Sequence, residues 1–271
     1  MLSLNKKNEV GLDQDEFVKA EDIKEYIAQA NKKEFELAFK VNRYMHDLLG
    51  DDESRKSEQL QCFFMSLYKK IHRNFQSVLI LSARGLKEPA FVLIRSLLDK
   101  LFIMKAVSGD NSKIKFWKDS QNAERIKLAN AIIKGDKGFE NADKREAEKY
   151  INRTPKTKST SQKKWAEWAG MLSDYNIVYR LFSGNVHFSA SSFKEDFLFH
   201  DQRQIIMNVA PDTEGIDKLL LTGIGYALQT CFVIIEHFSC ESHTPEKLHK
   251  LQEEYDMLSI ALIKNEELSG E

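Results

Sequence analysis

The sequence predicts an all-α fold, a helical bundle with long amphipathic helices. Three observations indicate this class. The 271 residues include only 4 Pro and 12 Gly, apolar residues recur three and four positions apart, and strand-like alternation of apolar and polar residues is almost absent. A chain of this length with 42% hydrophobic residues can bury a sizeable core. We therefore expect one all-α domain over residues 1–271.

The first helix is expected over residues 15–48, a charged amphipathic segment followed by Gly50, a residue type common at helix C-termini. This helix would flank the rest of the bundle. Its expected apolar contacts are Phe17, Ile23, Ile27, Phe35 and Phe39.

A helical hairpin is expected next, from Leu60 to Leu101. Its first helix carries a clear apolar stripe and ends near Arg84 and Gly85. Its second helix begins near Pro89, because proline is tolerated in a first turn. His72 has Lys70 and Arg73 as near neighbours, so it is expected on a solvated face.

The middle of the chain predicts one helix over residues 112–133 and then a polar region, 135–164. The second half of that region is expected to be a mobile basic loop. Helical spacing returns at Trp165 and Trp168, which are expected in the core or in a dimer interface, and it extends to Tyr179.

Three elements are expected in the C-terminal part. Alternating apolar residues predict a small β-hairpin near residues 196–209. Residues 215–238 form a long apolar helix, too short in its uncharged part and too rich in polar residues for a membrane span, so a buried central helix is expected. A charged helix over residues 245–264 closes the molecule.

The overall charge excludes a strong global attraction to nucleic acid or membranes, because 40 Lys and Arg oppose 41 Asp and Glu. The sum nevertheless hides an asymmetry. Residues 153–164 carry a charge of +5, whereas residues 245–271 carry −4. Any RNA contact would therefore use the first of these segments. Its basic residues, which are otherwise simply solvated, are Arg153, Lys156, Lys158, Lys163 and Lys164.

The cysteine count and the N-terminus favour a cytoplasmic protein. The three cysteines are an odd number, and two lie inside apolar runs, so a disulfide framework is not expected. The first eleven residues lack the apolar core of a secretory signal. The cluster Glu236, His237, Cys240, Glu241 and His243 completes no known ligand pattern, so no metal and no other cofactor is expected.

The pattern with the clearest chemical meaning pairs Arg180 with His187 at the end of an apolar helix. In a continuous helix the two side chains would share one face, since seven residues nearly complete two turns. Gly184 and Asn185 are instead typical of a helix end, where the chain can fold back and bring His187 toward Arg180. Either geometry assembles a small polar site.

An Arg and a His are sufficient to cleave RNA through its own 2′-hydroxyl. Imidazole exchanges protons near neutral pH, and guanidinium stabilises the charged phosphorane. Ser183 and Asn185 are expected to orient the phosphate. Arg95 and Asp99 have two interpretations: an internal ion pair between residues four apart, or a supporting role in which Asp99 orients His187 and Arg95 contacts phosphate.

The spacing from Arg180 to His187 resembles the R-x(4–6)-H signature of the HEPN superfamily, named for higher eukaryotes and prokaryotes nucleotide-binding. Residues 84–86, 94–99 and 179–187 also resemble an uncharacterised bacterial family grouped with HEPN-like proteins. The resemblance implies a HEPN-like core over about residues 60–240. It further implies a homodimeric, metal-independent endoribonuclease acting on RNA such as tRNA, in a toxin–antitoxin or anti-phage defence system with a partner protein.

Two other functions remain open from the sequence. The apolar Leu181, directly after Arg180, favours a catalytically inactive helical module that dimerises or binds a protein partner. A nucleotide-binding helical domain is the third hypothesis, although the chain has no Gly-rich phosphate loop.

Overall fold

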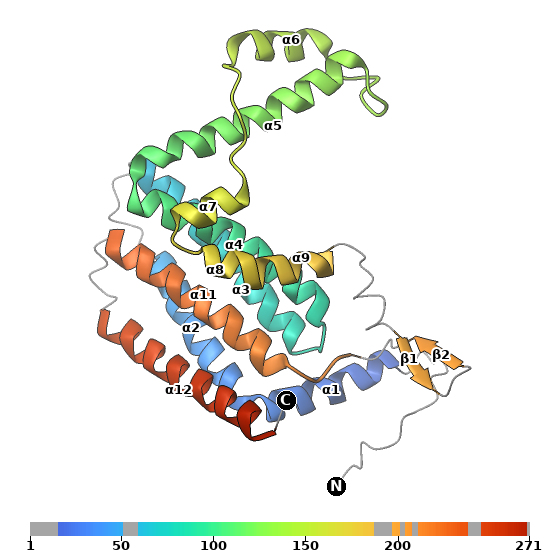
Figure 1. Cartoon of the computed structure of the whole chain (residues 1–271), viewed down its shortest axis with the longest axis vertical. Helices are drawn as coiled ribbons and strands as arrows, with labels where there is room; N and C mark the ends of the chain where they lie inside the picture. The colour runs from blue at the N-terminus through green and yellow to red at the C-terminus, as the bar shows by residue number, and fades with distance from the viewer. Residues whose placement is uncertain are drawn as a thin grey trace.

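The computed structural model describes residues 16–50, 59–186, 197–200, 204–207, 211–237 and 245–269. These residues form helices and one two-stranded sheet (Figure 1), which confirms the all-α class. The bundle helices are α1 (Glu16–Ala30), α2 (Lys32–Gly50), α3 (Gln59–Ser82), α4 (Lys87–Gly109), α11 (Ile216–His237) and α12 (Pro245–Ser269). The remaining elements are η2 (Asn111–Lys113), α5 (Ile114–Lys134), α6 (Lys144–Arg153), α7 (Gln162–Trp168), α8 (Leu172–Asp174), η3 (Tyr175–Tyr179), α9 (Arg180–Val186), β1 (Phe197–His200) and β2 (Gln204–Met207).

The core forms where α11 packs against the antiparallel α3–α4 hairpin. α2 and α12 cover the other side of α11. α11 is long and apolar enough to cross a membrane, but 67% of its most apolar window is buried inside the molecule. This burial is typical of the central helix of a bundle, and it confirms the buried helix expected over residues 215–238.

The long first helix expected over residues 15–48 is divided into α1 and α2 at Asn31. The Asn31 side chain donates a hydrogen bond to the carbonyl oxygen of Ile27 at 2.9 Å, as polar side chains do when they compete with helix hydrogen bonds. Ile27 and Phe35 are buried as expected. Phe39 makes an apolar contact with Phe35, at 6.0 Å between ring centres, but the Phe39 side chain is 58% exposed and lies at the edge of the core.

His72 is buried rather than solvated, with only 3% of its surface exposed. α2 packs on this side of α3, and Nε2 of His72 lies 2.8 Å from Oδ1 of Asn42. Burial lowers the pKa of His72 below its usual value, and the nearby His46 acts in the same direction. Lys70 and Arg73 are exposed on other sides of the helix. Charged neighbours in the sequence therefore did not indicate which side of α3 carries His72.

α5 and α6 form a helical arm that projects from the bundle (Figure 1). The polar region expected over residues 135–164 contains α6, a helix that the sequence interpretation did not include. Residues 154–161, most of the segment expected to be a basic loop, have no helix or strand, as expected. Asp143 caps α6 by accepting hydrogen bonds from the backbone N–H groups of Arg145 and Glu146. Asp143 followed by Glu146 also matches the spacing of a capping box, a signal in the sequence that could have revealed α6.

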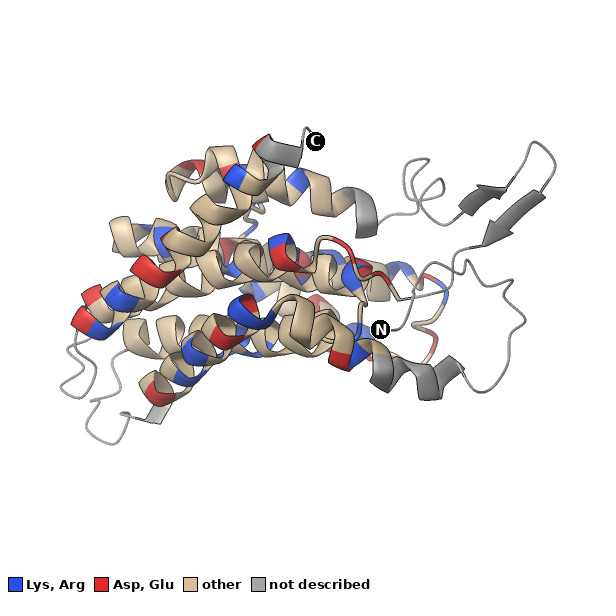
Figure 2. Ribbon diagram, turned by 90° about the horizontal axis from the view of Figure 1, so that it is seen from below, with Lys and Arg blue, Asp and Glu red and all other residues tan. Residues whose placement is uncertain are grey.

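The small β-hairpin expected near residues 196–209 is present. β1 and β2 pair antiparallel, with Phe197 opposite Met207 and Phe199 opposite Ile205. Around the rest of the molecule, charges of both signs are mixed. Figure 2 shows the bundle from below, where Lys and Arg are interspersed with Asp and Glu and no large area has one sign.

The turn between α3 and α4 is latched to the segment that leads into α11. Gly85 adopts a left-handed φ of 69°, and its carbonyl oxygen accepts a hydrogen bond from the Asp212 backbone N–H at 3.0 Å. Lys87 forms an ion pair with the Asp212 carboxylate and donates to the carbonyl oxygen of Glu214 at 2.8 Å. This latch holds the start of α11 against the hairpin.

Substituting Gly85→Ala is expected to destabilise the fold. The left-handed backbone costs a non-glycine residue about 1–3 kcal/mol. In addition, the new Cβ would lie 2.7 Å from the Asp212 carbonyl oxygen and 2.8 Å from Cβ of Pro211. Urea denaturation measures the loss. Gly170→Ala is the matched control, because Gly170 has a similar φ of 68° and no atom within 4 Å of the added Cβ. Equal losses of unfolding free energy in the two variants would show that the close contact of residue 85 with Pro211 and Asp212 does not contribute to the destabilisation.

Candidate functional site

The segment that carries Arg180 is an interrupted helix. After α7 and the left-handed Gly170, α8 leads into the π-helical segment η3, which continues directly into α9. A π-helix adds a residue to the turn and changes which side chains face the core, and such segments are frequent at functional sites. Here Tyr179 is buried, whereas the next residue, Arg180, is exposed.

Tyr179 joins two charged residues of α4. A terminal nitrogen of Arg95 donates a hydrogen bond to the Tyr179 hydroxyl at 3.1 Å, and the guanidinium carbon lies 4.9 Å from the centre of the ring. The Tyr179 hydroxyl also hydrogen-bonds to Asp99. Arg95 and Asp99 are not among the ion pairs of the described residues, so the direct pair expected as one interpretation is replaced by contacts to Tyr179.

Burial dominates the electrostatics of this cluster. It raises the pKa of Asp99, against the opposing effects of the Tyr179 hydrogen bond and the Arg95 charge. Burial and the Asp99 charge together raise the pKa of Tyr179 to about 12. Within the described part of the chain, Nε of Arg95 and Oδ1 of Asp99 have no hydrogen-bond partner. One buried donor and one buried acceptor of the cluster are therefore unsatisfied, and such unpaired buried atoms are uncommon in folded proteins.

α9 is held on α4 by aromatic packing. Phe182 stacks on Phe91 of α4, with ring centres 4.5 Å apart. The Ser183 hydroxyl donates to the Tyr179 carbonyl oxygen at 2.6 Å, so its hydrogen is already used within the helix. The structure thus gives Ser183 a backbone contact in place of a free hydroxyl donor.

Arg180 faces outward and makes no hydrogen bond or ion pair with another described residue. Asp174, an acidic residue nearby in the sequence, accepts a hydrogen bond from the Tyr226 hydroxyl at 2.9 Å. Ile177 and Leu181 flank Arg180 and are 65% and 66% exposed. His187 and the Asn185 side chain lie outside the described residues, so their distances to Arg180 stay undetermined.

The basic residues expected to bind RNA are exposed along one stretch of chain. Arg153 ends α6, Lys156 and Lys158 lie in the segment before α7, and Lys163 and Lys164 belong to α7. Lys164 pairs with Glu167 at 2.9 Å. α7 and α9 both pack on α4, so this stretch ends on the helix that carries Arg95 and Asp99.

Sequence reasoning missed Tyr179 as a site residue, because its helical spacing marked it only as a core aromatic. Trp165 is confirmed as a core residue, with 2% of its surface exposed. Among the residues that the structure describes, no group of three or more His, Cys, Asp or Glu side chains is arranged to hold a metal. A groove of about 360 Å³ lies elsewhere, between α2 and α12, where the Lys40–Glu254 ion pair spans it.

Comparison with known proteins gives one match. A family model described as a family of unknown function (DUF5677) matches residues 61–205, slightly more than half of the chain. This span includes Arg95, Asp99, Tyr179 and Arg180. Neither the curated proteins nor the solved structures contain a match to the chain.

Tyr179→Phe is expected to destabilise the protein by about 1–3 kcal/mol, because two partly buried charged side chains lose a hydrogen-bonding partner. Urea denaturation measures the change. Tyr175→Phe is the control: Tyr175 stacks on Tyr179 at 5.0 Å, but its hydroxyl has no hydrogen bond with other described residues. That control should change stability by less than about 0.5 kcal/mol. A Tyr179→Phe variant as stable as the control would show that the hydroxyl does not hold the cluster together.

Proposed function

Because this chain belongs to the DUF5677 family, whose description assigns no function, we propose a function from its own residues: metal-independent endoribonuclease activity of the HEPN type. One observation carries the proposal. The exposed Arg180 directly follows Tyr179, which is buried and hydrogen-bonded to Arg95 and Asp99. An exposed guanidinium on a helix that is held in place by packing is well positioned to contact a phosphate.

In the proposed reaction, the 2′-hydroxyl of RNA attacks the adjacent phosphorus and the 5′-oxygen leaves. His187 exchanges protons with these two oxygens, and Arg180 stabilises the negative charge of the phosphorane. The products are a 2′,3′-cyclic phosphate and a 5′-hydroxyl. The unpaired Oδ1 of Asp99 is an acceptor suited to orienting the imidazole of His187, and the unpaired Nε of Arg95 is a donor suited to a phosphate oxygen.

The proposal includes a cytoplasmic homodimer. Ile177 and Leu181 place exposed apolar surface on both sides of Arg180, and a second copy that covers this surface would bring two sites together. RNA cleavage of this kind, in which the 2′-hydroxyl of the RNA is the nucleophile, fits a bacterial toxin or anti-phage defence protein that acts on tRNA or other RNA. Such a protein would be controlled by a partner such as an antitoxin.

The test is cleavage of tRNA and total RNA in EDTA. Arg180→Ala is expected to lower the rate about 10²–10³-fold, as loss of transition-state charge stabilisation does, and His187→Ala about 10²–10⁴-fold. Arg43→Ala, which removes an exposed arginine of α2, is the control and should leave the rate unchanged. End analysis should find cyclic phosphates. Cleavage that persists in both site variants would refute the assignment.

A second candidate function is a catalytically inactive interaction module, and the exposure of Ile177 and Leu181 favours it. Under both candidates, Ile177→Asp combined with Leu181→Asp is expected to convert the dimer to a monomer in sedimentation velocity. A matched double substitution at the exposed Met257 and Ile260 of α12 should leave the dimer intact. RNA cleavage then separates the two candidates, because an inactive module cleaves no RNA. A dimer that survives the Ile177 and Leu181 changes would exclude this face as the interface.

A further inference from the structure

The positive charge of the chain is concentrated in one region. Residues 114–164, from the start of α5 into α7, contain fourteen Lys and Arg against seven Asp and Glu. The rest of the chain contains 26 Lys and Arg against 34 Asp and Glu. The near-zero net charge of the protein is therefore the sum of a basic arm and a more acidic remainder of the chain.

The basic region is also the thinnest part of the fold. α5 and α6 pack on each other and extend away from the bundle (Figure 1). Their buried side chains are only alanines, at positions 123, 129 and 147. Most of the arm surface, including its basic side chains, is therefore accessible to a partner.

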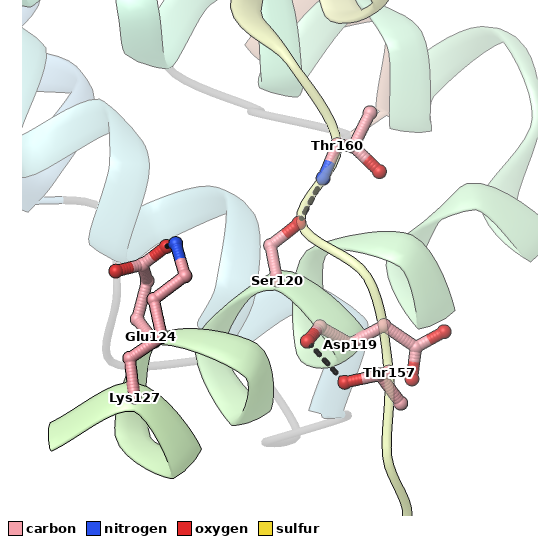
Figure 3. A network of polar contacts seen from close by, with 6 residues as sticks. All are labelled: Asp119, Ser120, Glu124, Lys127, Thr157 and Thr160. Carbon is pink, nitrogen blue, oxygen red and sulfur yellow. Dashed lines mark hydrogen bonds and ion pairs between the residues drawn. The ribbon is translucent and has the colours of Figure 1, made fainter. Parts of the chain in front are cut away.

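The segment that returns from α6 to the bundle is fastened along α5 (Figure 3). The Thr157 hydroxyl donates to the carbonyl oxygen of Asp119 at 2.7 Å, and the Thr160 backbone N–H donates to the Ser120 hydroxyl oxygen at 2.9 Å. Thr157 is half-buried against α5, whereas Lys156 and Lys158 on either side of it are exposed. The return segment therefore exposes Lys156 and Lys158 on either side of its contact with α5.

Within the described residues, the cations of the return segment other than Lys164 form no ion pair. The ion pairs along this region join Lys127 with Glu124, Lys149 with Glu146 and Lys164 with Glu167. In the described residues no ion pair involves Arg153, Lys156, Lys158 or Lys163, and no acidic residue occurs between Arg153 and Lys164. Like charges held close together without counterions favour a polyanionic partner.

We propose that the α5–α6 arm and the return segment hydrogen-bonded to α5, residues 153–163, bind the phosphate backbone of single-stranded RNA. This inference rests on the proposed function and names how its substrate is held. Contacts of this kind are independent of sequence, because they involve phosphates and no base edges. Base stacking is not part of the proposal, because the one large apolar side chain that the arm strongly exposes is the aliphatic Leu128.

The test measures binding of a fluorescein-labelled 20-nucleotide single-stranded RNA by anisotropy at several salt concentrations. All proteins carry Arg180→Ala and His187→Ala, so that RNA is not consumed if these residues cleave it. Adding Lys156→Ala and Lys158→Ala should weaken binding and reduce the slope of log K against log salt by about 1.4, or 0.7 per lost contact with a single strand. Lys247→Ala with Lys250→Ala removes the same charge from exposed positions of α12 and should leave the slope unchanged.

Equal effects of the two double variants would overturn the inference, since only net charge would then matter. Stronger binding of a DNA duplex than of the RNA, with the same dependence on Lys156 and Lys158, would also overturn it by assigning the arm to another nucleic acid. The proposed function is judged separately from the cleavage rates. A protein that binds RNA through the arm but cleaves none supports this inference and refutes the catalytic proposal.

Discussion

The structure depends on the burial of α11 between the α3–α4 hairpin on one side and α2 and α12 on the other. Thirteen residues of α11 are buried, and each large apolar side chain removed from water contributes about 1.5–3 kcal/mol. α11 follows the segment that is hydrogen-bonded to Gly85 in the α3–α4 turn, so the central helix is held at its start as well as along its length. The hairpin, held in this way, provides the surface on which the candidate site forms.

α4 serves both the core and the site. One face packs against α3 and α11, and another faces η3 and α9. Placing Arg95 and Asp99 on that second face removes charged groups from water, and the Tyr179 hydroxyl compensates only part of their hydrogen-bonding capacity. A fully satisfied structural cluster would leave no such atoms. The unpaired Nε and Oδ1 leave this cluster incompletely satisfied beside the helix that carries Arg180.

The excess of positive charge on the arm gives the molecule two regions with different physical roles. The bundle has apolar interiors and mixed surface charges, which is typical of a stable helical domain (Figure 2). The arm buries little and carries an excess of cations. An element that gains so little from its own burial is suited to gaining stability from a partner.

The sequence by itself determined the all-α class, α3, α4, α5, α11 and α12, and the presence of the small β-hairpin, because apolar periodicity depends mainly on local geometry. It also singled out Arg180, Arg95 and Asp99 by residue type and spacing. Only the tertiary structure decided that His72 is buried, that Phe39 is exposed and that Tyr179 links Arg95 with Asp99. Each of these depends on which neighbouring helix packs there, and the buried Tyr179 of the π-helical segment finds its hydrogen-bonding partner on α4. Helix periodicity carries no information on such contacts between distant segments.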